Sequence, residues 1–269
     1  MLISHEAPKN IMNLVQEHTD YDYCLVHLMQ ESNEYRNFFF DAKKKNRKII
    51  LDCSLYELGH AYDVNKYIAW INILDPSEYI VPDVFQNFEA NIQSFEKFMS
   101  IHNPFKVTGK TIGVVQGKTY KEMKESYVFM KENADKIAIS FGYDFYLKET
   151  NEEYKPLAFC KGRIMLINRL IEDGIIDYNK PHHLLGCGLP VEFSYYQQNK
   201  LKYSFIESID TSHPVLNGYF GELYHEDKLG TKRPEKMVDI FEENVSENQI
   251  LNIISNIKYF RNNIVMKVD

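Results

Sequence analysis

The chain has 269 residues, of which 44% are apolar and 26% charged, with a formal net charge of −7. This composition is typical of a globular protein and argues against a disordered or collagen-like chain, and the net negative charge does not indicate nucleic-acid binding. No run of about 18 apolar residues occurs, and the start MLISHEAPKN lacks the basic and apolar regions of a signal peptide, so we expect a cytoplasmic protein without membrane contact.

Short apolar runs alternate with longer segments of helical spacing, which indicates β/α units around a parallel sheet. The runs predict strands at residues 23–28, 48–53, 79–84, 111–116, 136–141, 183–187 and 203–210. The segments with helical spacing predict long helices at residues 87–102, 120–132, 156–173 and 246–261.

Seven predicted parallel strands fit a (β/α)8 TIM barrel whose eighth strand is residues 219–224 or 264–268. No linker or low-complexity tract divides the chain, so we expect one domain over residues 1–269. A doubly wound sheet stays an alternative, although no GxGxxG turn follows the first predicted strand.

Two groups of residues could form sites apart from the strand ends. The cysteines at 24, 53, 160 and 187 have no CxxC spacing, so we expect reduced, buried thiols and neither a zinc site nor disulfides. The basic run KKKNRK (residues 43–48) is interpreted as a solvated loop before a strand, with a phosphate-contacting loop as the alternative.

Four predicted strands end in a polar residue, namely Asp52, Asp83, Gln116 and Asp210. Side chains at the carboxyl ends of different barrel strands face one common cup. Each residue taken alone has another explanation, since Asp52 and Asp83 could be helix caps or turn formers and Gln116 a satisfied strand end.

Three carboxylates and one amide favour chemistry at an anomeric carbon over a metal site. The nine histidines form no HxH or HExxH pair, and the adjacent His182 and His183 would point to opposite faces of a strand. One Asp can serve as nucleophile and a second as general acid/base. The remaining Asp and Gln can bind a purine-like base that presents N–H donors beside a carbonyl.

Six motifs in order resemble the tRNA-guanine transglycosylase superfamily over residues 49–214. GVVQGKTYKEMKES (113–126) is similar to the family's GIVQGG segment with its helix, and LLGCGLP (184–190) to its LMGVGTP motif. The other four are LDCSLYE (51–57), VPDVF (81–85), IAISFG (137–142) in place of an AxGGL-type loop, and IDTSHP (209–214), which resembles the D-x-x-x-P nucleophile segment.

The resemblance implies a role for each matching residue. Asp210 would attack C1′ of a guanosine nucleotide, and Asp52 would act as general acid/base for the departing and incoming bases. Asp83 and Gln116 would hydrogen-bond the base, assisted by the backbone near Phe141 and Gly142. The base slot would be lined by Leu185 and Gly186, with Tyr56 or Phe85 stacking. No metal or organic cofactor is implied.

The sequence also departs from the family pattern. The double glycine after the fifth predicted strand reads Ser140-Phe141, and Val215-Leu216 replaces the usual Thr-Arg pair. No cysteine follows position 187, so the C-terminal CxCxxC…H zinc subdomain that supports dimerisation and tRNA docking in the tRNA enzymes has no counterpart here.

Because it lacks these zinc ligands, the sequence resembles the zinc-free, phage-type DNA 7-deazaguanine transglycosylases (DpdA-like). This resemblance implies that guanine in a polynucleotide, DNA rather than tRNA, is exchanged for a 7-deazaguanine such as 7-cyano-7-deazaguanine, in a bacterial or phage-infected cell. The alternatives are a zinc-less tRNA-guanine transglycosylase of the queuosine type and a non-catalytic paralogue that binds a base or a partner protein. The sequence does not decide whether a partner protein helps the chain to bind DNA.

Overall fold

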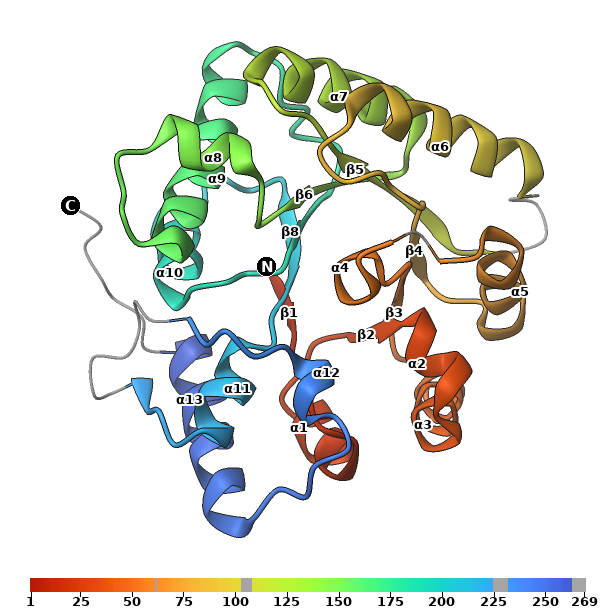
Figure 1. Cartoon of the computed structure of the whole chain (residues 1–269), viewed down its shortest axis with the longest axis vertical. Helices are drawn as coiled ribbons and strands as arrows, with labels where there is room; N and C mark the ends of the chain where they lie inside the picture. The colour runs from red at the N-terminus through yellow and green to blue at the C-terminus, as the bar shows by residue number, and fades with distance from the viewer. Residues whose placement is uncertain (61, 103–107, 225–231, 263–269) are drawn as a thin grey trace.

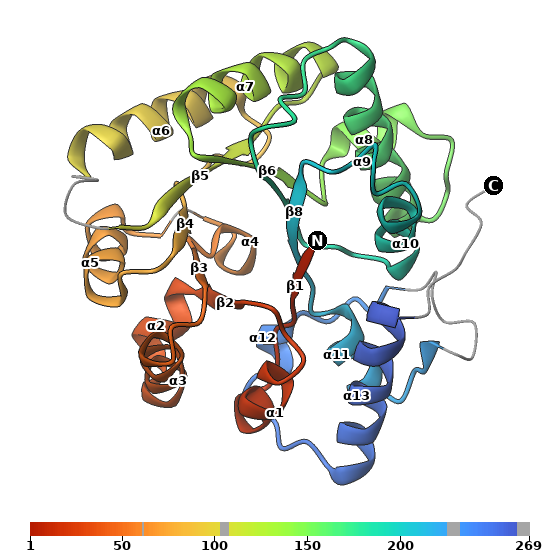
Figure 2. The same ribbon diagram turned by 180° about the vertical axis from the view of Figure 1, so that it is seen from behind.

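Eight parallel strands form a barrel in the computed structural model, which describes residues 1–60, 62–102, 108–224 and 232–262. The strand order in the sheet is β1-β8-β7-β6-β5-β4-β3-β2, and a ring of helices surrounds the strands (Figures 1 and 2). The strands are β1 Leu2–Ser4, β2 Asp22–Leu25, β3 Ile49–Asp52, β4 Glu78–Ile80, β5 Lys110–Val115, β6 Lys136–Ser140, β7 His182–Leu185 and β8 Ile206–Asp210.

The helices follow the strands in the alternating order that the sequence predicts. They are α1 Met12–Gln16, α2 Val26–Glu31, α3 Asn33–Lys44, α4 Leu55–Leu58, α5 Val64–Leu74, α6 Phe88–Ile101, α7 Tyr120–Asn133, α8 Asp144–Glu149, α9 Lys155–Glu172, α10 Pro190–Gln198, α11 His213–Tyr219, α12 Met237–Ile240 and α13 Glu247–Asn262, with a 3-10 turn at Lys9–Ile11. The barrel prediction and the four long helices are confirmed, and the doubly wound alternative is wrong.

The prediction of residues 219–224 as the eighth strand is wrong. Residues 219–224 form the end of α11 and a turn, and residues 264–268 lie outside the described part of the chain. The strand that completes the barrel is β1, which pairs with β8 in the register Ser4 to Asp210. The apolar run at β1 ends after Ile3, whereas the equally short β4 continues into Val81, so β1 gives no apolar run of the usual length.

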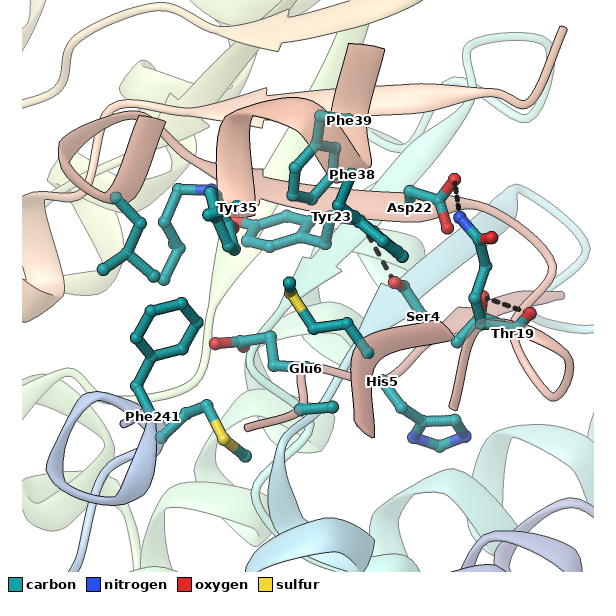
Figure 3. Close-up of a pocket in the computed structure, with 16 residues that line it drawn as sticks. Ser4, His5, Glu6, Thr19, Asp22, Tyr23, Tyr35, Phe38, Phe39 and Phe241 are labelled. Atoms are coloured by element: carbon teal, nitrogen blue, oxygen red, sulfur yellow. Dashed lines mark hydrogen bonds between the residues drawn. The ribbon is translucent and has the colours of Figure 1, made fainter. Parts of the chain in front are cut away.

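The seam between β1 and β2 carries no strand ladder in the described sheet and is closed by individual contacts. The backbone N–H of Tyr23 donates to Ser4 Oγ at 3.2 Å, as Figure 3 shows, and Ile3 N–H donates to Asp20 Oδ2 at 2.8 Å. Side chains of both strands, α1 and α3 leave a space of only about 40 Å³ beside this seam.

A close helix contact holds the last helix against the barrel wall. A Cβ on Gly218 in α11 would lie 2.5 Å from the Cα of Ile253 in α13, so glycine permits this approach. The predicted apolar stripe of α13 supplies Ile253 and Ile257, and neither side chain is exposed. Ser246 precedes the helix, and its Oγ accepts from Gln249 N–H at 3.4 Å.

The amino end of the barrel contains a compensated cluster of charges. Lys136 Nζ, fully buried, lies 2.8 Å from Glu78 Oε2 and 2.7 Å from Glu207 Oε2. Lys48 Nζ contacts the same two carboxylates at 2.9 and 3.1 Å. We call these four residues the basal ion cluster. Glu78, Lys136 and the neighbouring Ser208 come from β4, β6 and β8, the alternate-strand pattern of one barrel layer.

The basic run at 43–48 lies at the end of α3 and the start of β3, at the amino end of that strand. Arg47 pairs with Asp22 at 2.7 Å and Lys43 with Asp75 at 3.0 Å, while Lys48 belongs to the basal ion cluster. These ion pairs support a structural role for the run rather than contact with phosphate.

Candidate active site

A cavity of about 430 Å³ opens at the carboxyl ends of the strands. Its walls come from residues in or after the carboxyl half of every strand, together with α4, α12 and the segment before α12. All ten side chains singled out in the sequence line it: Asp52, Tyr56, Asp83, Phe85, Gln116, Phe141, Gly142, Leu185, Gly186 and Asp210. The structure therefore brings the predicted site residues together in one space.

Asp210 is the last residue of β8 and is 5% exposed. Its Oδ1 accepts a hydrogen bond from the Gly186 backbone N–H at 3.0 Å. The Nε2 of His183 lies 3.1 Å from the same oxygen, within ion-pair distance but without hydrogen-bond alignment. Among the described contacts both go to Oδ1, so Oδ2 is the oxygen available to a ligand.

Asp52 is the last residue of β3 and accepts two hydrogen bonds. Tyr23 Oη donates to its Oδ2 at 2.6 Å, and the backbone N–H of Ser54 donates to its Oδ1. Burial raises the pKa of Asp52 well above its usual range, with the charge of Glu57 adding to the rise and the two hydrogen bonds opposing it. A protonated Asp52 can serve as a general acid near neutral pH.

Asp83 and Gln116 form a hydrogen-bonded pair on another wall of the cavity. Gln116 Nε2 donates to Asp83 Oδ2 at 2.6 Å, and the backbone N–H of Gln86 donates to Gln116 Oε1 at 2.8 Å. Burial raises the pKa of Asp83, while the bond from Gln116 opposes the rise. These bonds fix both side chains, and an adjacent carboxyl and amide offer both acceptors and a donor to a planar ligand.

The buried side chain of Arg163, which sequence analysis does not single out, binds the backbone of the Leu185–Gly186 turn. Arg163 donates to Leu185 O at 2.8 Å and to Gly186 O at 3.3 Å. Its charge is matched by Glu192, with Nε to Oε1 at 2.6 Å, and both side chains are fully buried. The ion pair therefore positions the turn whose N–H contacts Asp210.

Phe141 forms part of the cavity wall at the position where the transglycosylase pattern has a double glycine. Phe141 packs against Gly188, where a Cβ would overlap the phenyl ring. Two cations lie over the same ring, Lys232 Nζ at 4.7 Å and Arg163 Cζ at 5.2 Å from its centroid. Phe85 and Tyr56 stand at the mouth with 49% and 68% of their surface exposed, so both are accessible for stacking.

Besides Glu235, two further carboxyl groups line the cavity that sequence analysis does not single out. Glu6 follows the unrecognised strand β1, and Figure 3 shows its side chain directed away from that of His5. Burial raises the pKa of Glu6 well above its usual range, and the charges of Glu57, Asp210 and Asp52 add to the rise. Burial, with the charge of Asp210, raises the pKa of Glu57 in α4 to about 7.

The segment before α12 brings positive charge to the rim. Lys232, Arg233 and Lys236 all line the cavity. Arg233 is paired with Glu222 at 3.0 Å and Glu235 at 2.8 Å. Lys236 Nζ lies 4.2 Å from the Tyr56 ring centroid. Burial and the charge of Arg163 lower the pKa of Lys232.

Other features bear on which chemistry this site can support. Within the described residues no three His, Cys, Asp or Glu side chains are placed to hold a metal ion. The four cysteines are buried and unpaired, as predicted. No helix in the described part of the chain is long and apolar enough to cross a membrane. The site thus offers carboxyl, amide, aromatic and lysine groups to a ligand.

Comparison with known proteins leaves the family open. The sequence matches no protein-family profile, and no curated protein is significantly similar to it. Among solved structures, the chain is similar to a dipeptide epimerase from Cytophaga hutchinsonii, whose structure contains Mg and the dipeptide D-Ala-L-Val, with 9% sequence identity and a TM-score of 0.43. The alignment covers 78% of this chain, which spans about half (52%) of the epimerase chain.

Proposed function

We propose that the protein is a guanine transglycosylase that replaces guanine in a polynucleotide, DNA in preference to tRNA, with a 7-deazaguanine such as 7-cyano-7-deazaguanine. The observation that carries the proposal is the convergence of Asp210, Asp52, Asp83 and Gln116 in one cavity. The order of the motifs that resemble the transglycosylase superfamily supports the same reaction, and no metal or organic cofactor takes part in it.

In the proposed first step the carboxylate of Asp210 attacks C1′ of the target nucleotide. The bond from C1′ to the guanine nitrogen breaks, and the base leaves with the bonding electron pair and takes a proton from Asp52. In the second step the incoming base gives its proton to the Asp52 carboxylate, its nitrogen attacks C1′, and the ester to Asp210 breaks. The raised pKa of Asp52 suits the acid role in the first step.

The remaining groups have roles in binding. Asp83 accepts from N–H donors of the base and Gln116 Nε2 donates to its carbonyl. The exposed rings of Tyr56 and Phe85 stack on bases, and Lys232 and Lys236 contact backbone phosphate at the rim. Because the target base must leave its stack at a cost of a few kcal/mol, single-stranded substrate is the better one.

The test measures incorporation of labelled 7-cyano-7-deazaguanine into single-stranded DNA, duplex DNA and tRNA by mass spectrometry of the nucleosides. Asp210→Asn is expected to lose exchange by at least about 10⁴-fold and to keep its circular dichroism spectrum, since the nucleophile is removed at a strand end. The matched control is Asp173→Asn on the outer surface, where exchange stays at the wild-type rate.

The outcomes separate the alternatives. Exchange in DNA supports the proposal, and exchange in tRNA alone assigns the zinc-less tRNA enzyme. Unaltered exchange by Asp210→Asn contradicts the assigned nucleophile. Binding of the free base without exchange in any polynucleotide assigns the non-catalytic paralogue.

A further inference from the structure

A line of buried polar contacts connects the basal ion cluster with Asp210 through the barrel interior. Lys136 Nζ lies 3.2 Å from Ser208 Oγ, and Ser208 Oγ lies 3.0 Å from His183 Nδ1. The other ring nitrogen, His183 Nε2, is the atom 3.1 Å from Asp210 Oδ1. Lys136, Ser208 and His183 are all fully buried, so water does not compete for these contacts.

The donor and acceptor capacities of these groups fix the direction of the hydrogen bonds. A lysine ammonium only donates, so Ser208 Oγ accepts from Lys136. Ser208 has one hydroxyl hydrogen, and His183 Nδ1 is the partner within reach to accept it. A neutral imidazole that accepts at Nδ1 carries its proton on Nε2, and that N–H faces Asp210.

Aromatic rings hold the imidazole in this orientation. The ring of Tyr23 stacks on His183 at 5.9 Å between centroids with an interplanar angle of 21°, and Tyr21 packs edge-on at 6.5 Å. Tyr23 also donates its hydroxyl to Asp52. One pair of stacked side chains thus contacts both carboxylates that the proposed reaction uses.

We propose that His183 is a positioning residue whose Nε2–H, set by Ser208 and Lys136, orients the carboxylate of Asp210. This inference rests on the proposed function for its catalytic consequence but not for its geometry. The Nε2 contact and the Gly186 N–H both act on Oδ1, which directs Oδ2 toward C1′ of a bound nucleotide. The contact gains hydrogen-bond alignment when substrate fills the site, as catalytic contacts in unliganded enzymes commonly do.

The neighbouring histidine provides a matched control. His182 precedes His183 but faces the other side of β7, where its Nε2 lies 2.9 Å from Tyr127 Oη. The two residues share strand, burial and ring chemistry and differ in the face they occupy. His182→Gln therefore tests loss of a buried ring away from Asp210, while His183→Gln and His183→Leu test loss of the ring beside it.

Activity measurements test the positioning role. His183→Leu is expected to lower kcat about 100-fold with KM for the incoming base unchanged, because orientation of the nucleophile is lost while the base pocket stays intact. His183→Gln, whose amide can donate to Asp210 and accept from Ser208, is expected to recover kcat to within about tenfold of wild type. Wild-type kcat in His183→Leu, or equal losses in His182→Gln and His183→Leu, overturns the proposal.

A spectroscopic measurement tests the geometry without activity. Long-range ¹H–¹⁵N spectra of histidine-labelled protein report the tautomer, and the His183 signals are assigned by their loss in His183→Gln. The expected result is an Nε2–H tautomer in wild type, a mixture of tautomers in Ser208→Ala, and a shifted Nε2 resonance in Asp210→Asn.

The tautomer measurement and the exchange assay can contradict the two proposals independently. An Nδ1–H tautomer in wild type overturns the inference even where exchange activity is present. Absence of exchange in every polynucleotide removes the proposed function, while an Nε2–H tautomer that responds to Asp210→Asn keeps the contact between His183 and Asp210.

Discussion

The charged groups at the two ends of the barrel differ in whether they form ion pairs. At the amino end two lysines face two glutamates at distances of 2.7–3.1 Å, and every charge of the basal ion cluster has a partner. At the carboxyl end the carboxyl groups of Glu6, Asp52 and Glu57 share the cavity with Asp210, and among the described contacts neither Lys232 nor Lys236 forms an ion pair with them.

This difference separates a structural site from a reactive one. Paired charges at the amino end satisfy each other and leave nothing for a ligand to compensate. Crowded carboxyl groups at the mouth instead hold protons that solvent-exposed carboxyls would release, which is the arrangement that acid/base chemistry needs. The stability of the mouth is therefore expected to depend on pH near neutrality.

The largest expected effect comes from breaking the compensated end. Lys136→Met leaves Glu78 and Glu207 to share Lys48, with one negative charge in excess, and is expected to destabilise the fold by about 3–5 kcal/mol, as removal of one partner from a buried ion pair commonly does. Urea denaturation monitored by circular dichroism measures the change.

A double variant keeps this test interpretable where Lys136→Met folds poorly. Adding Glu78→Gln removes the excess negative charge and leaves Lys48 paired with Glu207, so the double variant is expected to regain part of the lost stability. A double variant that is less stable than Lys136→Met alone contradicts the compensation argument.

A smaller effect is expected at the uncompensated end. The pKa of Glu57 is about 7 in the folded protein against an ordinary value of 4.5, so the folded state holds the proton more tightly. Its stabilising contribution is fully present below pH 4.5 and is lost as pH rises through about 7, on the order of 1–3 kcal/mol.

Glu57→Gln tests this pH dependence directly. The variant is expected to match wild type near pH 4 and to be the more stable protein at pH 8, in thermal denaturation across that range. Glu132→Gln, exposed on α7, should follow the wild-type curve throughout. A wild-type stability that does not fall between pH 4.5 and 7 relative to Glu57→Gln would show that Glu57 is ordinarily solvated.

The smallest effect is expected at a lysine–carboxylate ion pair on the surface. Lys124 and Asp173 lie 2.9 Å apart with more than a third of each side chain exposed. Lys124→Met is expected to change the denaturation midpoint within experimental error, because water replaces the lost partner. A loss comparable to that of Lys136→Met would mean that burial does not distinguish the two lysines.

Residues at the ends of recognisable strands could be predicted from the sequence, since strand periodicity places them at a common edge. Asp52 and Asp210 follow apolar runs of the usual length, and both line the cavity. Glu6 could not be found in this way because the apolar run at β1 ends after Ile3 and is too short to indicate a strand. Glu57 lies in the short helix α4, and the position of this helix at the cavity depends on tertiary packing.

His183 illustrates a different limit of sequence analysis. Adjacent histidines on a strand predict opposite faces, and the structure confirms this, with His182 against Tyr127 and His183 toward Asp210. Which face is inward depends on the barrel, however, and the link from Ser208 to Lys136 joins residues 72 positions apart. Long-range contacts of this kind have no local signature.

The pairing of β1 with β8 has a consequence for the order of events during synthesis. Ser4 lies opposite Asp210, so the first strand has no ladder partner until some 200 further residues have been translated. Pairing residues so far apart in the chain carries a loop-closure entropy cost and is typical of slowly formed contacts. Closure of the ring, with delivery of Glu6 to the cavity, therefore cannot precede the synthesis of β8.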